Sequence, residues 1–361
     1  MKVLLIGLGG IGQRHARNLR ALLPDVDLLA YRVRGYSHVV TPRLQADMGL
    51  DVEKTLGIRG FSDLDAALAE KPQIAVICNP SSLHVSTAIA CVTAGCDVLV
   101  EKPLADSLSG VSDLVRAAEE AGRIVMVAYQ LRFHPCVNQL ASIIASGSLG
   151  HLLSVRVTVG EYLPGWHPYE DYRGSYAARA ALGGGVVLTQ IHELDYLSSI
   201  FGVPRRVFAM GGHWSNLEID VEDTASALLE FSFQGRSLPV HIHQDYLQSP
   251  ASRQCEVIGD RGKVIMDLPS LTVSAHPFNG SEPTPYSFPN FDRNQLFIDE
   301  MQHFLACVKE RRRPIVDLHD GVTSLRMALA MKRSMTTGTL VSLDEEGLAW
   351  EKGGYVTSQT L

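Results

Sequence analysis

Two short stretches combine titratable side chains with backbone features that would hold those side chains in place. "VEKPL" (residues 100–104) carries Lys102 directly before a proline, and "GGGVVLTQIHELDYL" (residues 183–197) carries His192 shortly after three glycines. A histidine titrates near neutrality, so it can take a proton from a hydroxyl group and return it. A lysine can polarise the same oxygen, or act as the base if burial lowers its pKa. His192 is therefore a candidate general acid/base, and Lys102 a candidate polarising group.

A third stretch predicts a dinucleotide site. Gly7, Gly9 and Gly12 form a GxGxxG pattern that follows the apolar run "KVLLIG" and opens the helical pattern "IGQRHARNLRALL". In this context the glycines allow a tight turn, a close approach of a pyrophosphate and close packing of helix on strand. Gly10 and Ile11 would present free amides of the helix N-terminus to the phosphates. The alternative is a glycine-rich turn that binds no ligand.

The end of the second predicted strand, "VDLLAYR", bears on the choice between NAD and NADP. An acid about 20 residues past the glycines would bond the ribose hydroxyls of NAD. This chain has Arg32 there, followed by Arg34 and no adjacent acid. Arginine pairs well with a 2′-phosphate, so the sequence favours NADP, with Arg32 and Arg34 as contacts. The alternative is that both arginines are solvated and that NAD binds regardless.

The elements that would position these residues fall into two domains. Residues 1–130 alternate buried strands with helices, which predicts a doubly wound parallel sheet, the Rossmann arrangement of α/β proteins. Ser62 is expected to cap one of these helices. Residues 131–361 contain longer strands with few helices, which predicts an α+β domain with an open, mostly antiparallel sheet. Residues 270–293 are expected to be loop, and two helices close the chain, with their packing on the first domain left open.

The glycine run at residues 183–185 is expected to open a single helix over residues 186–201. On this helix Val187 and Leu194 would share an apolar face, with His192 opposite and Asp195 flanking it. A surface helix could show the same split. The bare glycine backbone would leave room for a flat ring or a sugar.

The composition excludes several classes of function. The chain has 361 residues, of which 46% are apolar and 20% charged, as in a soluble globular protein. The net charge of −7 without a basic stripe argues against nucleic acid as a partner. No apolar run approaches the ~20 residues that a membrane span needs. The six cysteines form no CxxC pair, which favours a cytoplasmic location. His241 and His243 lack an evident third ligand, so no metal site is expected.

The combination of motifs resembles the Gfo/Idh/MocA oxidoreductases, the family of glucose–fructose oxidoreductase and inositol dehydrogenase. Besides the glycine pattern and "EKP", the matching stretches are "NPSSLH" (79–84), "YQLRFHP" (129–135), "GSLG" (147–150) and "GGG…HELD" (183–195). They occur in the family's order and cover residues 1 to about 260. The resemblance is specific to the family and much less specific to a substrate.

The resemblance implies a Rossmann domain followed by an α/β domain. It implies NAD(P)-dependent hydride transfer at a secondary alcohol or ketone of a sugar, nucleotide sugar or cyclitol. The family's EKP lysine falls on Lys102, near the nicotinamide, and its helix histidine on His192. The family's aspartate one turn earlier falls on Thr189, so this chain departs from the pattern, and Asp195 or Glu193 could take over part of that role. Further residues expected to contact cofactor are Asn79, Pro80, His84 and Glu101. Further expected substrate contacts are Arg132, Trp166, Tyr172, Thr189 and Asp195.

Several alternatives stay open at this stage. Arg132 could instead be structural, and the aromatic loop around Trp166 could pack between the domains rather than stack on a sugar. The same motifs could serve an NAD-dependent glycosidase or lyase that oxidises its substrate transiently, or a dinucleotide sensor without catalysis. An open antiparallel sheet also needs cover, which predicts a homodimer or homotetramer through the C-terminal sheet.

Overall fold

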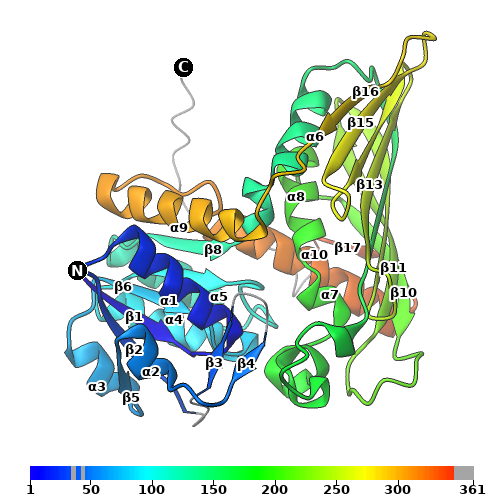
Figure 1. Ribbon diagram of the computed structural model, residues 1–361. Helices are drawn as coiled ribbons and strands as arrows, with labels where there is room; N and C mark the ends of the chain where they lie inside the picture. Colours follow the sequence, from blue (N-terminus) through cyan, green and yellow to red (C-terminus); the bar gives the residue numbers. More distant parts are fainter. Residues whose placement is uncertain (34–37, 42–44, 345–361) are drawn as a thin grey trace.

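The computed structural model describes residues 1–33, 38–41 and 45–344, which contain two large sheets (Figure 1). The first sheet has six strands in the order β5-β2-β1-β6-β7-β8, and its neighbouring strands pair in parallel. This order is that of a doubly wound dinucleotide-binding fold, so the predicted α/β class is confirmed. The strands are β1 (Lys2–Ile6), β2 (Asp27–Tyr31), β5 (Ile58–Phe61), β6 (Ile74–Ile77), β7 (Asp97–Glu101) and β8 (Val125–Ala128).

Helices cover both faces of this sheet, which explains why its strands are almost continuously apolar. On β1, Val3 and Leu5 pack in one buried cluster, and Leu4 and Ile6 in another. The helices are α1 (Gly10–Leu22), α2 (Val52–Leu56), α3 (Leu64–Ala69), α4 (His84–Thr93) and α5 (Val111–Glu120), and a short hairpin joins β3 (Val39–Val40) to β4 (Ala46–Asp47).

The predicted cap of α3 is wrong by one residue. Asp63 is the N-cap, and its carboxylate accepts a hydrogen bond of 2.7 Å from the Ala66 amide. Ser62 precedes it and lies outside the helix start. Both residue types can cap a helix, so only the backbone position of the first turn decides between them.

The second sheet has nine strands in the order β16-β15-β14-β13-β9-β12-β11-β10-β17. The β12–β9 pair is parallel and the other neighbouring pairs are antiparallel, so the predicted mostly antiparallel sheet is confirmed. Helices α6 (Pro135–Ala145), α7 (Val186–Thr189), α8 (His192–Phe201) and α10 (Leu318–Thr337) lie on one side of it (Figure 1). The strands are β9 (Leu152–Gly160), β10 (Arg206–Gly212), β11 (Thr224–Phe233), β12 (Arg236–Asp245), β13 (Ser252–Gly259), β14 (Gly262–Asp267), β15 (Thr272–Pro277), β16 (Thr284–Ser287) and β17 (Val341–Ser342).

The expectation of a loop over residues 270–293 is wrong, because β15 and β16 lie within it. Val273 is fully buried and pairs with Met266 of β14 on one side and with Tyr286 of β16 on the other. The proline-rich composition suggested a loop. However, β16 is an edge strand, where a proline such as Pro285 is tolerated.

The single helix expected over residues 186–201 is also wrong, since the segment forms α7 (Val186–Thr189) and α8 (His192–Phe201). Gln190 lies at the break. Its side-chain amide donates to the Asp245 carbonyl, and its own carbonyl accepts from the Gln244 side chain, both at 2.8 Å. These bonds to β12 replace helical ones. Residues 184–197 are buried without exception, so neither helix is a surface helix.

The last two helices connect the two sheets (Figure 1). Helix α9 (Arg293–Glu310) lies against α1, where Met301 and Phe304 join the buried cluster of the first sheet. The Val316 carbonyl then accepts from the Val127 amide of the edge strand β8 at 3.2 Å. Helix α10 (Leu318–Thr337) packs against α8 and β10. No helix among the described residues is long and apolar enough to cross a membrane.

The start of α10 allows a test of this connection. Asp317 caps the helix, accepting from the His319 and Asp320 amides, and it is buried. We expect Asp317→Ala to lower the free energy of unfolding by about 1 kcal/mol or more, the usual cost of losing such a cap. Urea denaturation measures this loss. Glu119→Ala, at an exposed residue of α5, is the control. Equal midpoint urea concentrations for the two variants would contradict the prediction.

Candidate active site

The glycine turn between β1 and α1 forms a cradle at the carboxyl end of the sheet. The Gly7 amide donates to the Tyr31 carbonyl of β2 at 2.9 Å, which ties the turn to the neighbouring strand. A Cβ on Gly12 would overlap the Gly7 carbonyl, so helix and turn could not pack with any larger residue. A Cβ on Gly9 would meet nothing within 4 Å, so the turn opens onto free space there. Helix α1 begins at Gly10 and Ile11, and its free amides therefore fit a pyrophosphate.

A tyrosine from the distant loop at residues 161–182 reaches this cradle, which the sequence analysis missed. A Cβ on Gly10 would lie 2.6 Å from the Tyr169 hydroxyl, so the phenol sits directly over the start of α1. Its ring stacks on His167, with centroids 5.4 Å apart. Burial raises the pKa of Tyr169 to about 12, so the hydroxyl is a neutral donor at pH 7. The glycine at position 10, which the fingerprint does not require, is the sequence signal for this contact.

The two arginines predicted to favour NADP have different outcomes. Arg32 forms an ion pair with Glu53 of α2, with its Nε atom 2.7 Å and its Nη2 atom 2.5 Å from the Glu53 Oε1 atom. Arg34 lies outside the described residues. The acid beside Arg32 comes from a helix and not from the strand end, so inspection of the strand could not find it.

The turns that follow β6 and β7 are joined by His84. Its Nδ1 atom lies 2.8 Å from the Pro103 carbonyl oxygen, and its Nε2 atom 2.8 Å from the Asn79 carbonyl oxygen. Burial lowers the pKa of His84, and the two carbonyls partly offset this effect. Asn79 donates to the Thr87 hydroxyl at 3.1 Å, and Pro80 caps the short helix of residues 81–83. His84 thus fixes the backbone around Asn79 and the EKP turn, which are both predicted cofactor contacts.

Glu101 is the last residue of β7, and Lys102 follows it at the carboxyl end of the first sheet. The Glu101 Oε1 atom lies 2.8 Å from Nε2 of the fully buried His15 of α1, which binds the EKP turn to the helix of the glycine cradle. The Lys102 ammonium donates to the Thr189 backbone carbonyl at 2.8 Å. This hydrogen bond joins the carboxyl end of the first sheet to α7. Lys102 and Thr189, 87 residues apart in the chain, therefore meet at one site.

His192 begins α8 within this site. Its ring meets the Tyr129 ring edge to face, with centroids 5.8 Å apart, and only 5% of the residue is exposed. Burial lowers the pKa of His192 well below its usual value, and the positive charges of Lys102 and Arg253 add to this effect. The imidazole is therefore neutral at pH 7. Its Nδ1 atom is buried and has no hydrogen-bond partner among the described residues.

Thr189, the residue at the family's aspartate position, meets Lys102 through its backbone. Its hydroxyl donates to the Gly185 carbonyl at 2.6 Å and contacts the Tyr246 hydroxyl of the second sheet. The side-chain hydroxyl is thus hydrogen-bonded within the protein, whereas the backbone carbonyl accepts from Lys102. A direct role of the Thr189 side chain in substrate binding stays a prediction.

The acids of the "HELD" segment are both paired with arginines. Asp195 is fully buried and accepts from Arg132 Nε at 2.7 Å and Nη2 at 3.0 Å. Burial raises the pKa of Asp195 to about 6 against the opposing effect of Arg132, so the carboxylate is still ionised at pH 7. Glu193 accepts from Arg253 of β13 at 2.7 and 3.0 Å. Arg132 and Asp195 therefore bind each other, and their substrate contacts stay predictions.

The predicted aromatic contacts lie in the loop after β9. The Trp166 ring packs edge to face on Tyr246, with centroids 5.3 Å apart, and the Tyr246 hydroxyl contacts the Thr189 side chain. The Tyr172 hydroxyl accepts from the Glu218 amide at 3.2 Å. Within the described part of the chain, no group of three or more His, Cys, Asp or Glu residues could hold a metal ion.

Comparisons with known proteins agree with the fold and the cradle. The profile of the oxidoreductase family with an NAD-binding Rossmann fold matches residues 1–129, and that of its C-terminal alpha/beta domain matches residues 141–343. A myo-inositol 2-dehydrogenase from Thermotoga maritima is 26% identical over 96% of this chain and 99% of its own length. A 1,5-anhydro-D-fructose reductase from Ensifer adhaerens is 26% identical over 82% and 85%.

A solved structure matches almost the whole chain. GenD2 from gentamicin A biosynthesis, in complex with NAD, is 25% identical, with a TM-score of 0.75 over 95% of this chain and 96% of its own. The fold and the cradle define a two-domain, NAD(H)-binding oxidoreductase that acts on CH–OH groups. The chain belongs to the Gfo/Idh/MocA oxidoreductase family, whose two domain profiles it matches in order.

The neutral state of His192 predicts a dependence of stability on pH. The pKa of this imidazole is lower in the folded than in the unfolded protein, so the unfolded chain binds the proton first as pH falls below about 6.5. The free energy of unfolding should therefore decrease below that pH. In His192→Gln, this decrease should be shallower by up to about 1.4 kcal/mol per pH unit. Urea denaturation between pH 7.5 and 5 measures the free energy of unfolding against pH for the wild type, for His192→Gln and for the control His151→Gln, whose histidine is exposed. Identical slopes for the wild type and His192→Gln would contradict the prediction.

Proposed function

We propose that this protein transfers a hydride between NAD(H) and a secondary alcohol or ketone of a sugar, nucleotide sugar or cyclitol. One observation carries the proposal. The neutral, buried His192 and the ammonium of Lys102 lie in one site at the edge where the dinucleotide cradle opens. The similarity to a myo-inositol dehydrogenase and an anhydrofructose reductase supports a polyhydroxylated substrate.

The roles of the two residues follow from their charge states and contacts. When bound, the nicotinamide would supply the acceptor or donor of the hydride. The His192 imidazole would take the hydroxyl proton as the alcohol is oxidised and return it in the reverse direction. Lys102 has three N–H donors and uses one on the Thr189 carbonyl, so others can reach the reacting oxygen. Its positive charge would stabilise the negative charge that develops there.

The cofactor raises two questions: whether the first domain binds a nicotinamide dinucleotide, and whether it prefers NAD(H) or NADP(H). The Rossmann domain binds NAD(H). The preference for NADP that the sequence favoured stays a prediction. It relied on an available Arg32, and the ion pair with Glu53 weakens it.

Substitution of the two proposed catalytic residues tests the mechanism. Reduced-nicotinamide absorbance would first identify an active substrate from a panel of sugars, cyclitols and nucleotide sugars. We then expect Lys102→Ala and His192→Asn each to lower kcat by a factor of about 100 or more, because each removes a charge or proton transfer from the transition state. The dissociation constant for NADH should change little. Lys309→Ala, an exposed lysine near the end of α9, is the control.

The outcomes separate the alternatives. A Lys102→Ala enzyme with wild-type turnover would remove that residue from the mechanism. Substrate conversion without net NADH formation would indicate transient oxidation, as in a glycosidase or lyase. Cofactor binding without conversion of any compound would favour a sensor.

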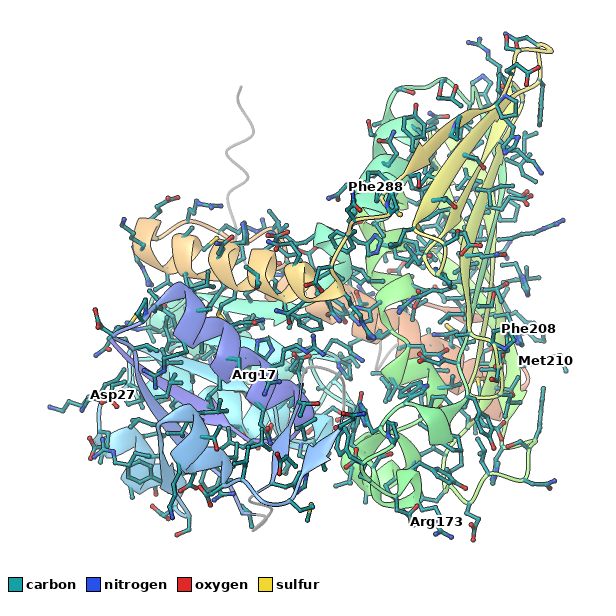
Figure 2. The ribbon with its side chains drawn as sticks, in the orientation of Figure 1. Arg17, Asp27, Arg173, Phe208, Met210 and Phe288 are labelled. Carbon is teal, nitrogen blue, oxygen red and sulfur yellow. The ribbon has the colours of Figure 1, made fainter. Side chains whose placement is uncertain are left out.

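We also propose that the outer face of the nine-stranded sheet holds a homodimer or homotetramer together. Phe208 and Met210 of β10 lie on the side of the sheet turned away from the helices (Figure 2). Leu228 of β11 is directly opposite Phe208 in the ladder, and it is 55% exposed, while Met210 is 61% exposed. An exposed apolar group on an open sheet is typical of an interface between protein chains.

A charge on this face should separate the subunits. We expect Leu228→Asp to shift the protein from dimer or tetramer to monomer in sedimentation velocity at micromolar concentration, because association would bury an unpaired carboxylate. Met48→Asp, at an exposed methionine of the first domain, should leave the assembly unchanged. A wild-type protein that sediments as a monomer would overturn this part of the proposal.

A further inference from the structure

The carboxyl end of β2 lies beside the glycine cradle. The Tyr31 carbonyl accepts from the Gly7 amide at 2.9 Å, and Arg32 is the next residue along the chain. The Arg32 amide in turn donates to the Phe61 carbonyl at the end of β5, at 3.1 Å. Arg32 is thus fixed between the cradle and β5. In a dinucleotide-binding fold this edge receives the ribose of the adenosine half.

A glycine in β5 leaves room for an acidic side chain of α2 near the carboxyl end of β2. A Cβ on Gly60 would clash with the Glu53 carboxylate, so the absence of a side chain on β5 gives Glu53 its room. Gly60 pairs in register with Ala30 of β2, close to the strand end. The Nε and Nη2 atoms of Arg32 both contact one oxygen of Glu53, Oε1. The Arg32 and Glu53 side chains keep 19% and 29% of their surface exposed, so a ligand can reach the pair.

The charge of this pair is unfavourable for a 2′-phosphate. Arg32 alone would attract one, but here its charge is balanced by Glu53, and the carboxylate itself would repel a phosphate. Ribose hydroxyls, in contrast, are donors that a carboxylate accepts well. The geometry points to Glu53 as the residue that selects NAD(H) over NADP(H), with Arg32 as the residue that positions its carboxylate. This inference rests on the proposed use of a nicotinamide dinucleotide and names the residue that sets its type.

Binding of the cofactor alone provides the test, so no substrate needs to be known. The dissociation constants for NADH and NADPH would be measured by fluorescence titration for the wild type and for Glu53→Gln. The wild type should bind NADH more tightly. In Glu53→Gln the ratio of the two constants should move toward NADPH by about tenfold or more, because the neutral amide no longer repels a phosphate.

The chain offers a matched control. Glu70 accepts from Arg59 of β5 at 3.2 and 2.7 Å in a second arginine–glutamate pair of the same domain, away from the cradle. Glu70→Gln should leave the ratio of the two constants unchanged. Glu53→Ala, checked by circular dichroism, is the second variant if the glutamine protein does not fold. It should move the ratio in the same direction.

The outcomes are distinct. Unchanged selectivity in folded Glu53→Gln and Glu53→Ala, with both cofactors still bound, would overturn the inference and leave the proposed function intact. A wild type that prefers NADPH would also overturn it and restore the argument from Arg32. If the wild type binds neither cofactor, the proposed function fails, and the inference fails with it.

Discussion

The site depends on the burial of residues 192–197, the first part of α8, which carry several polar side chains. A buried carboxylate is costly unless it is paired, and α8 carries two within its first turn. Asp195 is satisfied by Arg132 from the segment after β8, and Glu193 by Arg253 from β13. These two ion pairs connect α8 to the segment after β8 of the first sheet and to β13 of the second sheet. His192, at the start of the same helix, is thereby held in a dry environment that keeps it neutral.

The same burial sets the relation between Lys102 and α7. The helix breaks at Gln190, whose hydrogen bonds go to β12, and α7 is therefore oriented separately from α8. This orientation presents the Thr189 carbonyl to Lys102. A carbonyl can hold the ammonium in place but cannot take up a proton.

The residues around the glycine cradle also come from segments that are far apart in the chain. His15, Glu101 and His84 connect α1, β7 and the turn after β6, so the cradle and the EKP turn form one connected unit. Tyr169 reaches the cradle from the loop after β9, and Glu53 reaches the end of β2 from α2. The proposed cofactor site thus combines residues of the first domain with a tyrosine from the loop after β9.

The sequence by itself determined the class of fold, the two kinds of sheet and the positions of Lys102, His192 and the glycine cradle, because these depend on local patterns. Strand burial shows in continuous apolar runs, and a glycine turn shows in its spacing. The partners of the charged residues could not be found in this way. Glu53 beside Arg32, Arg132 beside Asp195 and the broken helix at Gln190 depend on contacts between segments far apart in the chain. Only the tertiary structure decided them, because the charge of a side chain is a local property whereas its pairing and burial are set by whatever packs against it.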